Sequence, residues 1–337
     1  LRLHGILEPI KYRVLNEEEM TDLVHEILSH DQRERFENGH DLDLAYESSE
    51  AGGRFRVNLF HKISGIGAVF RVIPPHTPTL KELGLPKVVG KMLDAHQGLI
   101  LVTGTTGTGK STTLAAMIDW LNRNRKFNII TLEDPIEYMH ESKASLVVQR
   151  SVGLHVESFA NGLREALRED PDVILVGELR DPETISLAMT AAETGHLVLG
   201  TLHTSSAVKT LDRIIDAMPA EQKAQAATFL GQHLKGVISQ VLVRTPDGRG
   251  RKAILEILLN TPGIANLIME RKIFQIPSSV QTGRELGMQL MDQALLDAIK
   301  NKEIDPDDAY VNATDKKLFQ RFVTNPELLP QVSLAVS

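Results

Sequence analysis

The segment Gly104–Ser111 has the residue types and the spacing of a phosphate-binding loop. It reads Gly-Thr-Thr-Gly-Thr-Gly-Lys-Ser, which fits the pattern G-x-x-x-x-G-K-[ST]. The apolar run Leu99–Val102 precedes it and a helix-forming stretch follows it from Thr112, as this motif requires. Glycines let the backbone wrap closely around a polyphosphate, so that N–H groups point at its oxygens. The start of the following helix adds a favourable dipole.

Within this loop we expect Lys110 to reach the β- and γ-phosphates and the Ser111 hydroxyl to coordinate Mg²⁺. The loop therefore predicts the binding of a nucleoside triphosphate with Mg²⁺. A chance Gly/Thr-rich turn is the alternative, and it is disfavoured because every fixed position is filled and both flanks are correct. The predicted nucleotide-binding residues are Gly104, Thr105, Thr106, Gly107, Thr108, Gly109, Lys110, Ser111 and Thr112.

An acidic residue, Glu178, follows the apolar run Val173–Val176 and Gly177. Side chains at the carboxyl ends of parallel strands lie at the sheet edge where a phosphate-binding loop also lies. An acid at that edge orients and activates the attacking water, or helps to hold Mg²⁺ through water. The alternative role for Glu178 is an acidic cap of the next helix, whose first turn contains Asp181 and Glu183.

Three further acids, Glu133, Asp134 and Glu137, come at the end of another predicted strand. Carboxylates this close repel one another unless a cation lies nearby. Bound Mg²⁺ would supply such a cation. Taken by itself, the segment is more typical of a solvated acidic turn, which is the other interpretation.

Two histidines, His196 and His203, flank the short apolar strand Leu197–Thr201. His203 comes at its carboxyl end, where a hydrogen bond to the γ-phosphate is in reach, while His196 belongs at the opposite edge. A structural role for either histidine is the alternative. Their separation does not fit a zinc site, so neither is assigned as a metal ligand.

Apolar strands that alternate with helices place these motifs in an α/β domain with a parallel sheet. The predicted strands are Leu99–Thr103, Asn128–Leu132, Ser145–Gln149, Val173–Val176, Leu197–Thr201 and Ala253–Leu258. The predicted helices are Lys87–Asp94, Lys110–Asn122, Phe159–Arg168, Pro182–Glu193, Ser206–Ile215 and Glu221–Ser239, followed by a helical tail to Phe322.

The first part of the chain reads differently, as a small α+β unit. It has one predicted helix, Glu17–Leu28, and three predicted strands, Asp41–Glu47, Phe55–Phe60 and Gly67–Ile73. The proline-rich stretch that begins Pro74-Pro75 is extended and stiff. We therefore predict an N-terminal domain over residues 1–74, a linker over 75–86 and an ATPase domain over 87–337.

Composition narrows the class of protein. The 337 residues suffice for two domains of about 150 residues each. The chain has no cysteine, which excludes disulfides and thiolate metal sites, and its net charge of −7 gives no reason to expect nucleic-acid binding. No apolar run approaches the roughly 20 residues of a membrane span, and no secretory signal is evident. The chain opens inside a strand-like stretch without a methionine, so we expect residues to precede Leu1.

With these motifs the chain resembles the secretion ATPase superfamily, and most closely the PilT-type retraction ATPases of type IV pili. Its stretches resemble that family's Walker A, Asp box, Walker B and His box, in the family's order. They are GTTGTGKST from Gly104, ITLEDPIEY from Ile130, DPDVILVGELRD from Asp170 and GHLVLGTLHT from Gly195. The similarity extends to Phe55–Pro74 and Pro219–Asp292, so it covers nearly the whole chain.

The resemblance implies an ATPase with ATP and Mg²⁺ as cofactors, built as a homohexamer of two-domain subunits. Each subunit has a PAS-like N-terminal domain and a RecA-like motor domain. Arg56 and Arg71 match the arginines through which the N-terminal domain completes the nucleotide site, and Arg54 is a weaker match. Glu178 matches the catalytic glutamate, with Ser111 as the other residue at Mg²⁺, and Glu133 and Glu137 match acids of the Asp box. Surface charge on an exposed strand is the alternative for the arginines.

The family further implies a cytoplasmic location, peripheral at the inner-membrane base of the pilus. The implied partners are a pilus platform protein and a paralogous retraction ATPase, with no nucleic acid and no insertion into the membrane. Two departures from the family are evident. Residues 263–270 lack both arginines of the retraction family's AIRNLIRE stretch, and the family's first strand and helix are missing.

Three other functions stay open. A pilus extension or type II secretion motor belongs to the same superfamily, although such relatives usually carry a four-cysteine zinc motif that this chain lacks. A DNA-translocating RecA-like hexamer shares the phosphate-binding loop, and the acidic net charge disfavours it. A non-hydrolysing partner subunit is disfavoured by the complete set of Lys110, Ser111 and Glu178, while the altered stretch 263–270 keeps it open.

Overall fold

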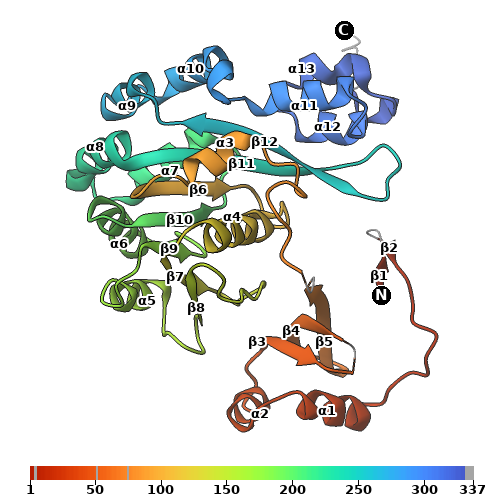
Figure 1. Cartoon of the computed structure of the whole chain (residues 1–337). Coiled ribbons are helices and arrows are strands. Elements are labelled where there is room, and N and C mark those ends of the chain that lie inside the picture. Colours follow the sequence, from red (N-terminus) through yellow and green to blue (C-terminus); the bar gives the residue numbers. More distant parts are fainter. Residues whose placement is uncertain (4–5, 51, 74–75, 331–337) are drawn as a thin grey trace.

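The computed structural model describes residues 1–3, 6–50, 52–73 and 76–330. Figure 1 shows a large sheet with helices on both faces and a separate small sheet that carries two helices. The domain limits 1–74, 75–86 and 87–337 stay predictions, and Pro74, Pro75 and the last residues from 331 onward lie outside the described residues.

The small N-terminal unit is a three-stranded antiparallel sheet, in the order β3-β4-β5, packed on two helices. Val57 and Leu59 point from β4 to the helices and are fully buried, together with Val24 and Phe36. A two-stranded antiparallel sheet precedes the unit, and Gly5, which the opening strand of the sequence would include, lies outside the described residues. The elements are β1 (Arg2–Leu3), β2 (Ile6–Leu7), α1 (Glu17–Glu26), α2 (His30–Glu37), β3 (Leu42–Ser48), β4 (Gly53–Lys62) and β5 (Gly65–Ile73).

The large sheet has seven strands in the order β12-β11-β6-β10-β9-β7-β8, and only β12 runs antiparallel to its neighbour. The predicted α/β class with a parallel-rich sheet is thereby confirmed. The strands are β6 (Gly98–Thr103), β7 (Asn128–Glu133), β8 (Leu146–Ser151), β9 (Val173–Val176), β10 (Leu197–Leu202), β11 (Leu234–Arg244) and β12 (Arg251–Leu259).

Helices cover both faces of this sheet and each face has its own apolar core. Helices α3 and α4 pack on one face, and α5 to α10 pack on the other. The last helices, α11 to α13, form a third cluster with Val243 of β11 and Ile254 of β12, at the upper right of Figure 1. The helices are α3 (Lys87–Met92), α4 (Lys110–Asn124), α5 (Phe159–Ala166), α6 (Pro182–Glu193), α7 (Ala207–Ala217), α8 (Lys223–His233), α9 (Pro262–Met269), α10 (Ile276–Thr282), α11 (Met291–Lys300), α12 (Pro306–Asn312) and α13 (Lys316–Phe319).

The predicted helix Glu221–Ser239 is wrong in its second half. Helix α8 ends at His233, and β11 starts at Leu234 and lies between β6 and β12. Because β11 is covered on both faces, its apolar residues form a nearly continuous run rather than an alternating one, and such a run reads equally well as a helix. Helix α2 was missed for the opposite reason, since it buries only Phe36 in an otherwise polar segment.

One buried acid holds two helices of the large unit together. Glu256 of β12 is only 8% exposed, and its Oε1 accepts a hydrogen bond of 2.6 Å from the Ala207 N–H at the start of α7. Its Oε2 accepts one of 3.3 Å from the Met291 N–H at the start of α11. Burial raises the pKa of this carboxyl, while the two helix N-termini supply partial positive charge to the carboxylate.

We expect Glu256→Gln to lower the free energy of unfolding by about 1–3 kcal/mol. Glutamine has one acceptor oxygen, so its amide NH₂ must face one of the two helix N–H donors and leave that donor unpaired. Urea unfolding followed by circular dichroism measures the change. Glu270→Gln, at an exposed acid on the surface, is the control and should stay within about 0.5 kcal/mol of wild type. Equal stability of Glu256→Gln and wild type would contradict the bridging role.

Candidate functional site

The predicted phosphate-binding loop joins the buried strand β6 to helix α4. Its glycines adopt conformations that other residues avoid, with φ values of 146° at Gly104, 81° at Gly107 and 87° at Gly109. Within the described chain, no side chain caps the N-terminus of α4. The first N–H groups of that helix are therefore open to an anion, as a phosphate site requires.

The side chain of Lys110, the first residue of α4, packs against the backbone of this loop. Its Nζ donates to the carbonyl oxygens of Gly104 at 2.8 Å and Thr105 at 3.1 Å. Burial lowers the pKa of Lys110, and the negative charges of Glu178 and Glu137 act in the opposite direction. These two acids, from separate segments, thus lie close enough to Lys110 to act on its charge. The structure brings the loop, the Walker B-like acid and the Asp box acid to one edge of the sheet.

Backbone and side-chain hydrogen bonds hold the turn that carries Glu178. The Gly177 N–H donates to the Leu132 carbonyl of β7 at 2.7 Å, and its own carbonyl accepts from Thr201 Oγ1 of β10 at 2.5 Å. A side chain at Gly177 would be crowded, because its Cβ would lie 3.0 Å from the Leu132 oxygen. Glu178 therefore leaves the sheet at a fixed place between two parallel strands.

The Glu178 carboxylate faces a histidine rather than a helix. Its Oε1 lies 3.3 Å from His203 Nε2 and 3.6 Å from Arg180 Nε. The cap of helix α6 is Asp181, whose Oδ1 accepts from the Thr184 N–H at 2.8 Å. The alternative assignment of Glu178 as a helix cap is therefore wrong. His196 sits at the other end of β10, where its Nδ1 contacts the Ala191 carbonyl at 2.9 Å.

The two Asp box glutamates have different surroundings. Glu133 Oε1 accepts from Thr131 Oγ1 at 2.6 Å and from Gln149 Nε2 at 3.2 Å. Burial raises the pKa of Glu133, and the nearby charge of Glu137 adds to that effect. Glu137 faces the N-terminal unit instead. Glu133 is thus hydrogen bonded to residues of the large unit, while Glu137 contacts the N-terminal unit.

Arg56 of β4 is the residue that reaches Glu137. Its Nη1 lies 3.5 Å from Glu137 Oε1, and its Nε lies 3.8 Å from Asp43 Oδ1. Arg71 of β5 stands directly opposite Arg56 in the register of the two strands. Opposite residues of an antiparallel pair point to the same face of the sheet. Both predicted arginines therefore lie on one face of the small sheet. Through Arg56 this face contacts Glu137, at the sheet edge of the large unit that carries the Asp box and Glu178.

A partly buried histidine lies in the loop between β7 and β8 that carries Glu137. Burial lowers the pKa of His140 to about 4, with Asp119 acting to raise it and Lys143 acting to lower it. Its backbone N–H donates to Gln149 Oε1 at 2.8 Å, so the same glutamine supports both Glu133 and this loop. Protonating the imidazole would place a positive charge at a poorly solvated position near Lys143.

The pKa of His140 is lower in the folded chain than in the unfolded chain. The unfolded chain therefore takes up a proton first as the pH falls, and the free energy of unfolding decreases between pH 6.5 and about pH 4. From the two pKa values, we expect His140 to lower the free energy of unfolding by about 2 kcal/mol between pH 7 and pH 5. Urea unfolding at both pH values measures this. His140→Gln does not titrate and should lose about that much less stability on acidification. An identical pH dependence of wild type and variant would rule the contribution out.

Two polar residues at the site were not predicted from the sequence. Tyr138 OH is hydrogen bonded to Thr112 Oγ1 at 3.0 Å, which joins the Asp box to the first turn of α4. Gln240 of β11 is 1% exposed and contacts the phosphate-binding loop. The signal for Gln240 was an amide within the mainly apolar run Val237–Val243, none of which was assigned to a strand.

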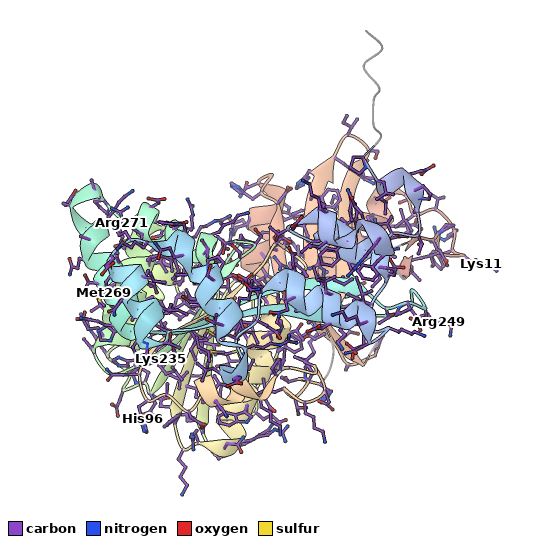
Figure 2. The ribbon with its side chains drawn as sticks, turned by 90° about the horizontal axis from the view of Figure 1, so that it is seen from above. Lys11, His96, Lys235, Arg249, Met269 and Arg271 are labelled. Atoms are coloured by element: carbon purple, nitrogen blue, oxygen red, sulfur yellow. The ribbon has the colours of Figure 1, made fainter. Side chains whose placement is uncertain are left out.

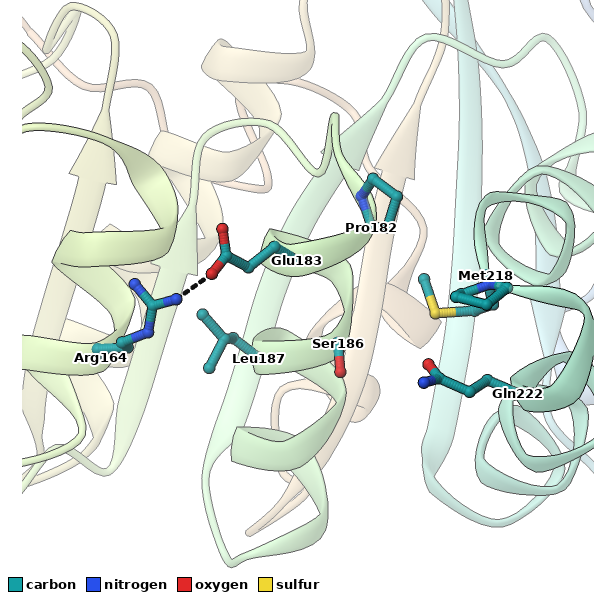
Figure 3. A pocket seen from close by; sticks show the side chains of 8 residues that line it. Arg164, Pro182, Glu183, Ser186, Leu187, Met218 and Gln222 are labelled. Atoms are coloured by element: carbon teal, nitrogen blue, oxygen red, sulfur yellow. Dashed lines mark hydrogen bonds and ion pairs between the residues drawn. The ribbon is translucent and has the colours of Figure 1, made fainter.

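A surface cavity of about 320 Å³ lies away from these residues, between α5, α6 and the segment that leads into α8. Figure 3 shows Arg164 paired with Glu183 on one side and Met218 facing it from the other. Neither the phosphate-binding loop nor Glu133, Glu137 or Glu178 lines this cavity. It is therefore separate from the candidate site.

Comparison with known proteins agrees with the geometry of the site. The profile of the family "Type II/IV secretion system protein" matches residues 34–305. A twitching motility protein of Neisseria gonorrhoeae is 49% identical over 309 residues, which is 92% of this chain and 82% of that protein. The type IV pilus retraction ATPase PilT of Pseudomonas aeruginosa is 50% identical over 295 residues, with 88% and 85% covered.

A solved structure extends this likeness to the fold. A crystal structure of the pilus retraction motor PilT with bound ADP superposes with a TM-score of 0.87 at 42% identity, over 95% of this chain and 91% of that one. The chain belongs to the type II/IV secretion system protein family, among its PilT-type ATPases. All four motifs described above fall within the part of the chain that the family profile matches.

The two altered positions of this PilT-type chain lie outside the buried face of helix α9. Residues 263–270 span most of α9, and Ala265 and Met269 stand where the retraction family's stretch has arginines. Met269 is 37% exposed, and Figure 2 shows it close to Arg271 at one side of the molecule. The substitution therefore changes an outer surface and leaves the residues around Lys110 untouched.

Proposed function

We propose that this chain is a motor that hydrolyses ATP to retract type IV pili and so drives twitching motility. The observation that carries the proposal is the convergence at Lys110. Glu178 and Glu137 act on its charge from two strand ends, and Arg56 of the N-terminal unit reaches Glu137. A catalytic acid, a phosphate-binding lysine and an arginine from another domain are the parts that phosphoryl transfer to water requires.

In this proposal the loop residues Gly104 to Thr112 bind ATP, with Lys110 on the β- and γ-phosphates. Two observations support nucleotide binding by this loop: the start of α4 has no side-chain cap, and the loop glycines have positive φ values. The Ser111 hydroxyl and Glu178, the latter through water, would hold Mg²⁺, which neutralises charge on the phosphates. For this step Lys110 has to leave the carbonyls of Gly104 and Thr105.

Glu178 orients the attacking water and accepts its proton, and His203 at 3.3 Å holds the carboxylate in place and is close enough to respond to the γ-phosphate. Glu133 and Glu137 shape the acidic edge. Arg56 and Arg71 stabilise the negative charge that spreads over the phosphate oxygens. The arginines come from a different unit than the loop, so binding and hydrolysis change how the two units meet.

We further propose a homohexamer that works at the cytoplasmic face of the inner membrane, on a pilus platform protein and beside a paralogous retraction ATPase. Among the described residues, no helix is long and apolar enough to cross a bilayer. The net charge of −7 disfavours nucleic acid as a partner. The linker 75–86 connects the two units that move.

Two measurements test this function. The purified chain should hydrolyse ATP without DNA and should run at the mass of a hexamer when ATP is present. Deletion of its gene in a piliated host should give hyperpiliated cells that do not twitch. Bald cells would instead indicate an extension or secretion motor, and dependence on DNA would indicate a translocase. A folded chain without ATPase activity would indicate a partner subunit.

A further inference from the structure

Gln240 of β11 presents a buried amide to the phosphate-binding loop. Its Nε2 donates a hydrogen bond to the carbonyl of Thr108, and its Oε1 accepts one of 2.9 Å from Thr113 Oγ1. The residue is 1% exposed. One amide therefore ties the last part of the loop to the first turn of α4, on either side of Lys110.

The loop also packs against the backbone of the same residue. A Cβ at Gly104 would lie 2.5 Å from the Gln240 carbonyl oxygen, and a Cβ at Gly109 would lie 3.1 Å from Gln240 Nε2. A side chain at Gly104 would therefore collide with the backbone of β11, and one at Gly109 would press on the Gln240 amide. Gln240 is thus the residue against which both the first and the last glycine of the loop are fitted.

The hydrogen bond to Thr108 has a direct consequence for phosphate binding. The peptide unit that joins Thr108 to Gly109 is planar, so its C=O and N–H point in opposite directions. When Gln240 Nε2 holds the Thr108 carbonyl toward β11, the Gly109 N–H is turned toward the space that the loop encloses. N–H groups at this position of such loops donate to phosphate oxygens.

We propose that Gln240 is a positioning residue for ATP, which fixes the direction of the Gly109 N–H and the place of the first turn of α4. The inference rests on the proposed function, because it concerns the same nucleotide site. It assigns a role to β11, which none of the four motifs includes. Gln240 itself does not touch the nucleotide and acts through Thr108 and Thr113.

The test compares wild type with Gln240→Met, Gln240→Glu and Ser239→Ala, with N-methylanthraniloyl-ADP as the fluorescent probe. Gln240→Met keeps the length and volume of the side chain and removes both hydrogen bonds. Gln240→Glu keeps an acceptor for Thr113 but has no donor for Thr108. Ser239→Ala is the matched control, because it removes an equally buried hydrogen bond of 2.7 Å, to Thr103 Oγ1, from the adjacent position of the same strand.

We expect the Kd for the probe to rise about tenfold or more in both Gln240 variants, which corresponds to about 1.4 kcal/mol. The KM for ATP should rise by a similar factor with kcat within about twofold, since a lost binding donor acts on ground state and transition state alike. Ser239→Ala should stay within about twofold of wild type. Nucleotide-free urea unfolding identifies which variants are folded, and Gln240→Glu is decisive where Gln240→Met is not folded.

Two results overturn the inference. One is a folded Gln240 variant that binds the probe as wild type does. The other is an equal loss in Ser239→Ala, which would trace the effect to the strand rather than to the amide. Failure of the wild-type chain to bind the probe at all is a different result, because it overturns the proposed function itself.

Discussion

Replacing Glu178 with glutamine lowers ATP turnover by about 10²–10⁴-fold and leaves ATP affinity close to that of wild type. The reason is the position of its carboxylate, beside His203 at 3.3 Å and close enough to Lys110 to act on its pKa. Glutamine has nearly the same shape but cannot accept the proton of the attacking water. The loop that binds the phosphates is unchanged, so the substitution slows hydrolysis without weakening ATP binding.

Single-turnover hydrolysis and probe binding, measured on the same preparation, check this result. Glu193→Gln is the matched control, because it removes an equal charge from an exposed position at the end of α6. That variant should retain turnover within about twofold of wild type. Undiminished hydrolysis by Glu178→Gln would remove Glu178 from the catalytic role, and Glu133 and Glu137 would then be the next acids to test.

Local patterns were sufficient to predict where the loop Gly104–Ser111 and Glu178 lie in the fold. Each lies within a few residues of a buried strand, so its place at the sheet edge follows from the strand's direction. The parallel direction of the strands followed in the same way from alternating strands and helices, while their order in the sheet was not predicted. The likeness to PilT-type ATPases supplied what local patterns lacked, namely the arginines of the N-terminal unit.

Residues whose partners are distant in sequence escaped prediction. Gln240 meets Thr108 across 132 positions of the chain, and Glu256 meets Ala207 across 49. Nothing near either residue in the sequence shows which donors will surround it. A polar residue inside an apolar run is the remaining signal, because burial of a lone amide or acid requires hydrogen-bonding partners. The same run concealed β11, whose two covered faces removed the alternation that marks a strand.

Arg56→Ala is the second change with a large expected effect, a fall in kcat of about a thousandfold. In the structure Arg56 is held by two long contacts, at 3.5 Å to Glu137 and 3.8 Å to Asp43, with about a third of its side chain exposed. Partly exposed ion pairs of this kind contribute at most about 1 kcal/mol. The arginine is therefore easily released to a stronger partner, and a γ-phosphate with its developing charge is such a partner.

The variants of this position separate charge from shape. Arg56→Lys keeps the positive charge but loses the planar fork, so it should recover only part of kcat. Arg35→Ala, at an exposed arginine of α2, is the control and should leave kcat within about twofold. Glu137→Gln removes the acid that holds Arg56, and it should lower kcat far less than Arg56→Ala does. If Arg56 only neutralised Glu137, the two variants would be equally impaired, and if it were surface charge, neither would change kcat. A large loss confined to Arg56 means that the N-terminal unit completes the hydrolytic site, so that hydrolysis itself depends on how the two units meet.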